Sequence, residues 1–204
     1  MQNDPKYPKY GIFVEAEGEL ARHLRFLAVA VSDDTTRYFM CDIEVEEMEP
    51  ATEERKYPLL RGIATDGRRL HIVEPLSASA SVIHGMTPGR YHVVSVKGKY
   101  VQLAKFAEAP GAFPNWRKVV PEGLPKYETT FECFSLSGRH AGSSSAALAK
   151  MLRAFPAPTG INLKYLADLG QDDEWKVGWY GANRAIDFTS GPKRAVIMPM
   201  CMDE

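Results

Sequence analysis

One Asp-Gly turn limits the fold of this chain more than any other feature of its sequence. Asp66-Gly67 lies in the turn Thr65 to Arg68 and separates two short apolar runs, Leu59 to Ala64 and Arg69 to Val73. Glycine accepts a positive φ at low cost, so Asp-Gly between two such runs is a strong turn signal. The pattern predicts two strands joined at this turn.

Strands and helices are segregated along the chain rather than strictly alternating. Period-two alternation of apolar residues predicts a strand over Arg37 to Glu46. Other predicted strands are Tyr10–Glu15, Tyr91–Val96, Tyr100–Phe106, Thr129–Leu136, Trp175–Tyr180, Ala185–Thr189 and Arg194–Met200. Predicted helices are Gly18–Ser32, Ala146–Phe155 and Leu163–Leu169, the second preceded by a loop over Ser137–Ser145 and the third capped by Asn162. This order favours an α+β fold with antiparallel sheets over a doubly wound parallel fold.

The composition is that of a globular protein without a strong charge bias. Apolar residues make up 45% of the 204 residues, and 26 acidic residues nearly balance 25 basic ones. Bulk charge therefore does not indicate a strongly basic nucleic-acid binder. The three cysteines are far apart, which favours reduced thiols over disulfides or a zinc site. No signal peptide or membrane-spanning run is evident, and we expect a cytoplasmic protein.

Motifs for enzyme chemistry are weak. The run Gly138 to Ser145 lacks the ending of a phosphate-binding loop, and His140 near its serines is a poor signal for a catalytic base. Asp172-Asp173-Glu174 is typical of a solvated acidic turn rather than a metal site. We therefore expect no cofactor and no metal, and consider an enzyme on an unrelated α+β scaffold only as a minor alternative.

Five segments, in order along the chain, share motifs with one protein family. They are Leu20–Glu44, Ala64–Leu70, Phe113–Pro121, Asn162–Leu169 and Ala195–Met200. The second reads Ala-Thr-Asp-Gly-Arg-Arg-Leu and the fifth reads Ala-Val-Ile-Met-Pro-Met. They resemble Ala-Thr-Asp-Gly-His-Arg-Leu and the closing Tyr-Val-Val-Met-Pro-Met-Arg-Leu of the bacterial DNA polymerase III β subunit, the sliding clamp. The resemblance implies a DNA-clamp-like fold, with antiparallel sheets and helices on one face.

The resemblance also implies a groove that receives linear peptides of DNA polymerases and other replication or repair proteins. Carried over position by position, its residues are Thr65, Gly67, Arg68, Arg69, Leu70, Pro114, Lys118, Val119, Val196, Met198, Pro199 and Met200. The apolar members offer an adaptable lining, and the basic members offer donors to peptide carbonyls or a carboxylate. The alternative is that Met198 to Met200 is only the end of a core strand. The chain continues past the family's end with Cys201 to Glu204, whose two acids would repel an acidic peptide.

Family clamps also encircle double-stranded DNA without reading its sequence, through basic residues on the helices that line the ring. The candidates here are Arg22, Arg25, Lys150, Arg153 and Lys164, with an ordinary solvated helix face as the alternative. One chain of this length is too short to encircle a duplex, so a ring requires a homo-oligomer. A non-ring, peptide-binding adaptor that regulates replication or repair is the second hypothesis.

The resemblance divides the chain into two parts. Residues 1–124 resemble the clamp's middle domain with its second half shortened, and residues 125–204 resemble the second half of its last domain. The two parts could also form one compact clamp-type unit.

Overall fold

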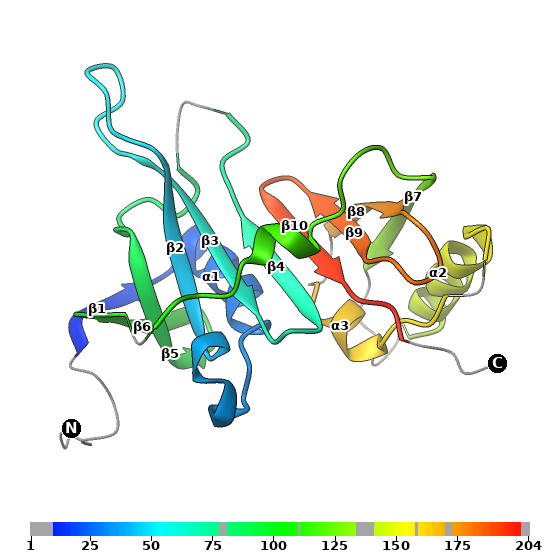
Figure 1. Ribbon diagram of the computed structural model, residues 1–204, viewed down its shortest axis with the longest axis horizontal. Helices are drawn as coiled ribbons and strands as arrows, with labels where there is room; N and C mark the ends of the chain where they lie inside the picture. Colours follow the sequence, from blue (N-terminus) through cyan, green and yellow to red (C-terminus); the bar gives the residue numbers. More distant parts are fainter. Residues whose placement is uncertain are drawn as a thin grey trace. The chain divides into compact units, whose positions relative to one another are not determined.

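The computed structural model describes residues 10–77, 81–109, 111–133, 141–157, 159–169 and 173–200 (Figure 1). The chain divides into two compact units. The first holds residues 1–67 and 71–114, and the second holds residues 68–70 and 115–204. The division after Pro114 comes earlier than the division after residue 124 that the resemblance suggested.

The first unit is built on antiparallel strands covered by one helix. Its strands follow the order β1-β6-β5-β2-β3-β4. Their bounds are β1 Tyr10–Ala16, β2 Asp42–Glu49, β3 Leu59–Thr65, β4 Arg69–Val73, β5 Gly89–Lys97 and β6 Tyr100–Phe106, and β4 begins in the second unit. The helix is α1, Gly18–Ala28, drawn in blue behind the strands in Figure 1. The predicted strands around the Asp-Gly turn are confirmed.

Close packing of α1 on β3 organises the core of the first unit. Leu24 and Leu27 are fully buried, and a Cβ at Gly62 of β3 would lie 2.6 Å from Cδ1 of Leu27. A larger residue at this position would require the buried Leu27 side chain to shift, so glycine favours the close approach of the helix. On β4, the buried His71 ring stacks on Phe26 of α1 at a centroid distance of 4.2 Å. The buried face of α1 therefore packs closely on the strands, and hydrogen bonds to His71 and to the carbonyls of Val82 and Gly98 add to this packing.

Several strand ends in this unit differ from the prediction by one to three residues, and the larger errors are at the end of α1 and at the start of the predicted strand Arg37–Glu46. The helix ends at Ala28 rather than Ser32, because the amides of Ala30 and Val31 bond carbonyls three residues back and tighten the last turn. The predicted strand Arg37–Glu46 begins as the 3₁₀ helix η1, Thr35–Met40. Asp34 caps η1 by accepting hydrogen bonds from the amide and hydroxyl of Thr36. A local cap thus prevails over the alternating pattern.

The turn between β3 and β4 takes the geometry that its sequence demands. Gly67 has φ +86°, a conformation that favours glycine. Its amide donates to Oγ1 of Thr65 at 3.0 Å, and this hydrogen bond stabilises the turn. Thr65 itself is buried. Both predicted groove residues thus have structural roles in the first unit.

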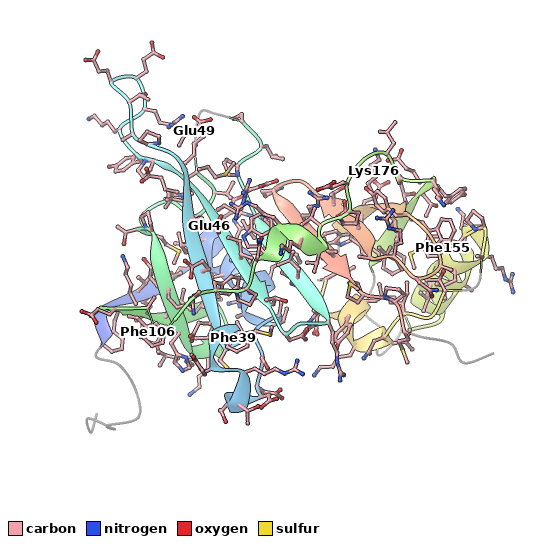
Figure 2. The ribbon with its side chains drawn as sticks, viewed as in Figure 1. Phe39, Glu46, Glu49, Phe106, Phe155 and Lys176 are labelled. Carbon is pink, nitrogen blue, oxygen red and sulfur yellow. The ribbon has the colours of Figure 1, made fainter. Side chains whose placement is uncertain are left out.

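The second unit carries four more antiparallel strands in the order β10-β9-β8-β7. Their bounds are β7 Tyr127–Cys133, β8 Asp173–Trp179, β9 Ile186–Ser190 and β10 Lys193–Ile197. The helices are the 3₁₀ helix η2 Trp116–Val119, α2 Ala141–Ala154 and α3 Leu163–Ala167. Phe155, labelled in Figure 2, stacks on Trp179 of β8 at 6.0 Å in the core of this unit. The α+β fold class with antiparallel pairing is confirmed.

In the second unit the predicted strands and helices are shifted by one or two residues at several ends, and the larger differences are at α2, α3 and β10. α2 begins at Ala141, so Ala141 to Ser145 is helical and not loop; packing of α2 on β7 stabilises turns that local propensity alone does not. α3 ends at Ala167 instead of Leu169. β10 ends at Ile197 instead of Met200, because Pro199 has no amide hydrogen with which to continue the strand. Residues 134–140, at the end of the predicted strand Thr129–Leu136 and the start of the predicted loop, lie outside the described residues.

Within the described residues, every helix is too short or too polar to cross a lipid bilayer.

Candidate functional site

The end of β10 and the start of β4 meet in the second unit. The amide of Met198 donates to the carbonyl of Arg68 at 2.9 Å, and β4 is the neighbour of β10 in the strand order. A backbone hydrogen bond thus joins two of the five sequence segments. The two bonded residues, 68 and 198, are 130 positions apart in the sequence. Pro199 has no amide to continue the strand, which explains why β10 stops here.

Arg69 anchors helix α3 beneath this junction. Its buried guanidinium donates from Nη1 to Oδ2 of Asp168 and lies 4.5 Å from the ring centroid of Tyr165. Asn162 begins α3 by accepting the amide of Lys164 at 3.0 Å, which confirms the predicted cap. Arg69 therefore makes an ion pair and a cation–π contact inside the unit. These contacts indicate that Arg69 positions α3.

Two predicted lining residues belong to the core. Leu70 of β4 and Val196 of β10 are each 1% exposed. Both side chains are therefore core residues of the strands that lead to Arg68 and Met198, and neither is exposed as a groove lining would be.

The chain after β10 presents exposed apolar side chains. Met198 is 40% exposed and Met200 55% exposed. The amide of Met200 donates to the carbonyl of Gly160 at 2.9 Å, and Leu163, three residues further on, is 53% exposed. We call Arg68, Leu163, Met198, Pro199 and Met200 the methionine surface. Leu163 was missed by sequence reasoning, although its position directly after the Asn162 cap marks it as the first, outward residue of a helix.

Other predicted groove residues are distributed between the units. Lys118 and Val119 are exposed on η2, where the buried Trp116 lies under the guanidinium of Arg117 at 4.4 Å. η2 belongs to the same unit as the methionine surface. Thr65, Gly67 and Pro114 belong to the first unit. Thr65 and Gly67 form the turn described above, and Pro114 is half-buried.

The predicted DNA-facing residues are exposed with one exception. Arg22 forms a surface ion pair with Glu19 at 3.4 Å, while the half-buried Arg25 donates from Nη2 to the carbonyl of Gly98 in the β5–β6 turn. In the second unit, Lys150 and Arg153 are exposed on α2, and Lys164 is exposed on α3.

The electrostatics of the described residues show an internal ion-pair system in each unit. In the second unit, Arg194 donates from Nε and Nη2 to the two carboxylate oxygens of Asp187 at 2.8 and 2.7 Å. Burial raises the pKa of the nearby Tyr180 hydroxyl, and the Asp187 carboxylate adds to this increase. In the first unit, Arg90 donates from Nε to Glu44 at 2.6 Å. Burial likewise raises the pKa of the Cys41 thiol, so this thiol is less reactive than an exposed one.

Within the described ranges, no group of three histidine, cysteine, aspartate or glutamate side chains is placed to hold a metal ion. His140 and Asp172 fall outside these ranges. Ser143 to Ser145, considered beside His140 as a weak catalytic signal, lie in the first turns of α2.

Solved structures of bacterial sliding clamps resemble this fold. The Caulobacter crescentus β sliding clamp aligns with a TM-score of 0.58 and 16% identity, over 98% of this chain and 69% of the clamp chain. DNA polymerase III subunit beta from Borrelia burgdorferi aligns with a TM-score of 0.56 and 12% identity, over 97% and 65%. The sliding clamp of Bartonella birtlesii aligns with a TM-score of 0.53 and 17% identity, over 98% and 70%.

These comparisons establish a clamp-like fold in a chain that spans 65 to 70% of the length of these three clamps. The clamp-like fold implied by the sequence resemblance is thereby confirmed. No protein-family model matches the sequence, and no curated protein sequence matches it either.

Proposed function

We propose that this protein acts as a sliding-clamp-like factor that docks linear peptides of replication or repair proteins on its methionine surface. The junction of Arg68 with Met198 carries this proposal, because it sets two exposed methionines directly after a hydrogen-bonded strand end in a clamp-like fold. The first unit would correspond to the clamp's middle domain and the second to the last domain. A cytoplasmic location fits this role.

The chemistry of the methionine surface suits a short apolar peptide. Methionine side chains are flexible and polarisable, so Met198 and Met200 can adapt to different apolar side chains. The exposed Arg68 adds a cation at the same strand end, where a peptide carbonyl or carboxylate can accept its hydrogen bonds. The ion pair of Arg69 with Asp168 keeps α3, and with it Leu163, in a fixed position. Peptide binding is therefore expected to depend mainly on apolar contact.

Ligands on related clamps support the choice of test. The Bartonella birtlesii clamp is bound to griselimycin, and the Caulobacter crescentus clamp has polyethylene glycol in a region linked to β-motif tethering. Fluorescence polarisation with a labelled peptide that binds bacterial clamps, with griselimycin as competitor, tests the docking function. Saturable binding that griselimycin displaces is expected, and an absence of binding at high micromolar protein would contradict the proposal.

The second part of the proposal is assembly around double-stranded DNA. Arg22, Arg25, Lys150, Arg153 and Lys164 would contact phosphates without reading sequence. A ring requires several copies, because the chain spans at most 70% of the three clamp chains. Multi-angle light scattering at micromolar concentration, followed by retention on circular DNA, tests this part. A strict monomer that is not retained on DNA would remove it.

A non-ring adaptor that competes for clamp partner peptides is the second candidate function. The nearly balanced charge, 26 acidic against 25 basic residues, favours it over a strong DNA binder. Peptide binding by a monomer that does not bind DNA would identify the adaptor.

A further inference from the structure

A second basic element lies beside the basic helix face of the first unit. The β5–β6 hairpin turns through Lys97, Gly98 and Lys99, and Gly98 has φ +50°. Both lysines are exposed. Neither lies on a helix, in contrast to the five predicted DNA-facing residues.

A hydrogen bond ties this hairpin to α1. Arg25 donates from Nη2 to the carbonyl of Gly98, which lies between the two lysines. Arg22 precedes Arg25 by one helical turn on the same helix and is exposed. Tyr100, 44% exposed, follows Lys99 at the start of β6 and pairs with Lys97 across the hairpin. We call Arg22, Arg25, Lys97, Lys99 and Tyr100 the hairpin surface.

The neighbouring acids do not cancel these cations. Glu19 pairs with Arg22 at a largely exposed position, where such pairs are weak and screened by salt. Glu15 of β1 accepts a hydrogen bond from Gln102 at 3.3 Å. Glu17, just before α1, is exposed. The hairpin turn itself contributes two exposed cations and no acid, and Arg22 and Arg25 add two cations from α1.

We propose that the hairpin surface binds the phosphate backbone of double-stranded DNA, with Lys97 and Lys99 as contacts that add to those of α1. This inference rests on the DNA-binding part of the proposed function. Lysine, arginine and tyrosine are all side chains that hydrogen-bond phosphate oxygens, and this contact carries no base information. The bond from Arg25 to Gly98 fixes the distance between the helix cations and the hairpin cations, so the surface is organised before DNA arrives.

The test measures binding of a fluorescein-labelled random-sequence duplex by the full chain at several salt concentrations. The variant is Lys97→Gln with Lys99→Gln, and the control is Lys56→Gln with Lys126→Gln, which removes the same charge from two other exposed positions. The affinity falls as salt rises, and each lost phosphate contact makes the slope of log K against log salt less steep by about 1. We therefore expect the slope of the hairpin variant to be less steep by about 2, with a smaller change in the control.

The outcomes separate the inference from the function on which it rests. Equal slopes in variant and control, with clear binding by the unaltered protein, would overturn the inference and leave DNA binding intact. No duplex binding by the unaltered protein would overturn both, while the peptide assay would still report on the methionine surface. A third outcome is that the unaltered protein binds poly-glutamate but not duplex, and that the hairpin variant loses this binding. It would assign the surface to an acidic protein and also overturn the inference. Circular dichroism confirms that the variant is folded.

Discussion

The methionine surface and the hairpin surface represent two different ways to build a binding surface. The first is apolar, lies at the end of a strand, and depends on a buried ion pair that fixes the adjacent helix. The second is cationic, lies on a helix and a turn, and depends on a single hydrogen bond to a backbone carbonyl. The difference teaches that a buried ion pair supports the apolar methionine surface, whereas the hairpin surface exposes its own charged side chains. Binding at the two surfaces should therefore respond differently to salt.

The largest effect is expected at the ion pair beneath the methionine surface. Asp168→Asn leaves the buried Arg69 guanidinium without its carboxylate, and the free energy of unfolding should fall by about 3 kcal/mol. Trp116, Trp175 and Trp179 all lie in the second unit, so tryptophan fluorescence during urea unfolding reports on this unit. Glu122→Gln, at an exposed position of the same unit, is the control. An unchanged unfolding midpoint for Asp168→Asn would refute the anchoring role.

The next effect concerns the apolar character of the methionine surface. Met198→Asp with Met200→Asp places two charges where apolar contact is expected, and peptide affinity should fall by about 2 kcal/mol, or roughly 30-fold. Leu76→Asp is the control, since Leu76 is 74% exposed in the first unit. Fluorescence polarisation at low and high salt measures both. If wild-type peptide affinity instead drops steeply with salt, the contrast between the two surfaces fails.

A smaller effect is expected on the helix side of the hairpin surface. Arg22→Gln should make the slope of log K against log salt for duplex binding less steep by about 1, and it should leave peptide affinity unchanged. Glu19→Gln is the matched variant, because it removes the carboxylate that pairs with Arg22 and should strengthen duplex binding slightly. Equal effects of the two substitutions on duplex binding would argue against phosphate contact by Arg22.

The smallest effect concerns pH and the second unit. Because the folded protein raises the pKa of Tyr180, the unfolded chain loses this proton first as pH rises. The associated stability is present below about pH 10 and is lost as pH rises through the folded pKa. Urea midpoints from about pH 8 to about pH 11 should therefore fall less in Tyr180→Phe than in the unaltered protein. Parallel decreases in both proteins would show that Tyr180 does not contribute.

Local signals in the sequence were sufficient for the fold class and for many elements. The Asp-Gly turn, the α1 apolar face and the Asn162 cap each depend on residues within a few positions of one another, and each is found in the structure. The strand β6 has the predicted bounds. Where a local cap competed with a longer pattern, as at Asp34, the pattern gave the wrong element.

The candidate site was only partly accessible to the sequence. The sequence motifs identified the segments that contain Arg68 and Met198, and they showed that these segments hold apolar and basic residues. They did not distinguish Leu70 and Val196, which are core, from Met198 and Met200, which are exposed. All four are apolar residues in strand-like segments, and exposure depends on what the rest of the chain places over each one.

By itself, the sequence determined the turns, the caps, the apolar periodicities and the resemblance to sliding clamps, since these depend on the chemistry of adjacent residues. Only the tertiary structure decided that Arg69 pairs with Asp168 and that the amide of Met198 reaches the carbonyl of Arg68. It also decided that Arg25 holds the turn between Lys97 and Lys99. The physical reason is that each of these contacts joins residues distant along the chain, and their meeting is fixed by strand order and helix packing rather than by any local preference.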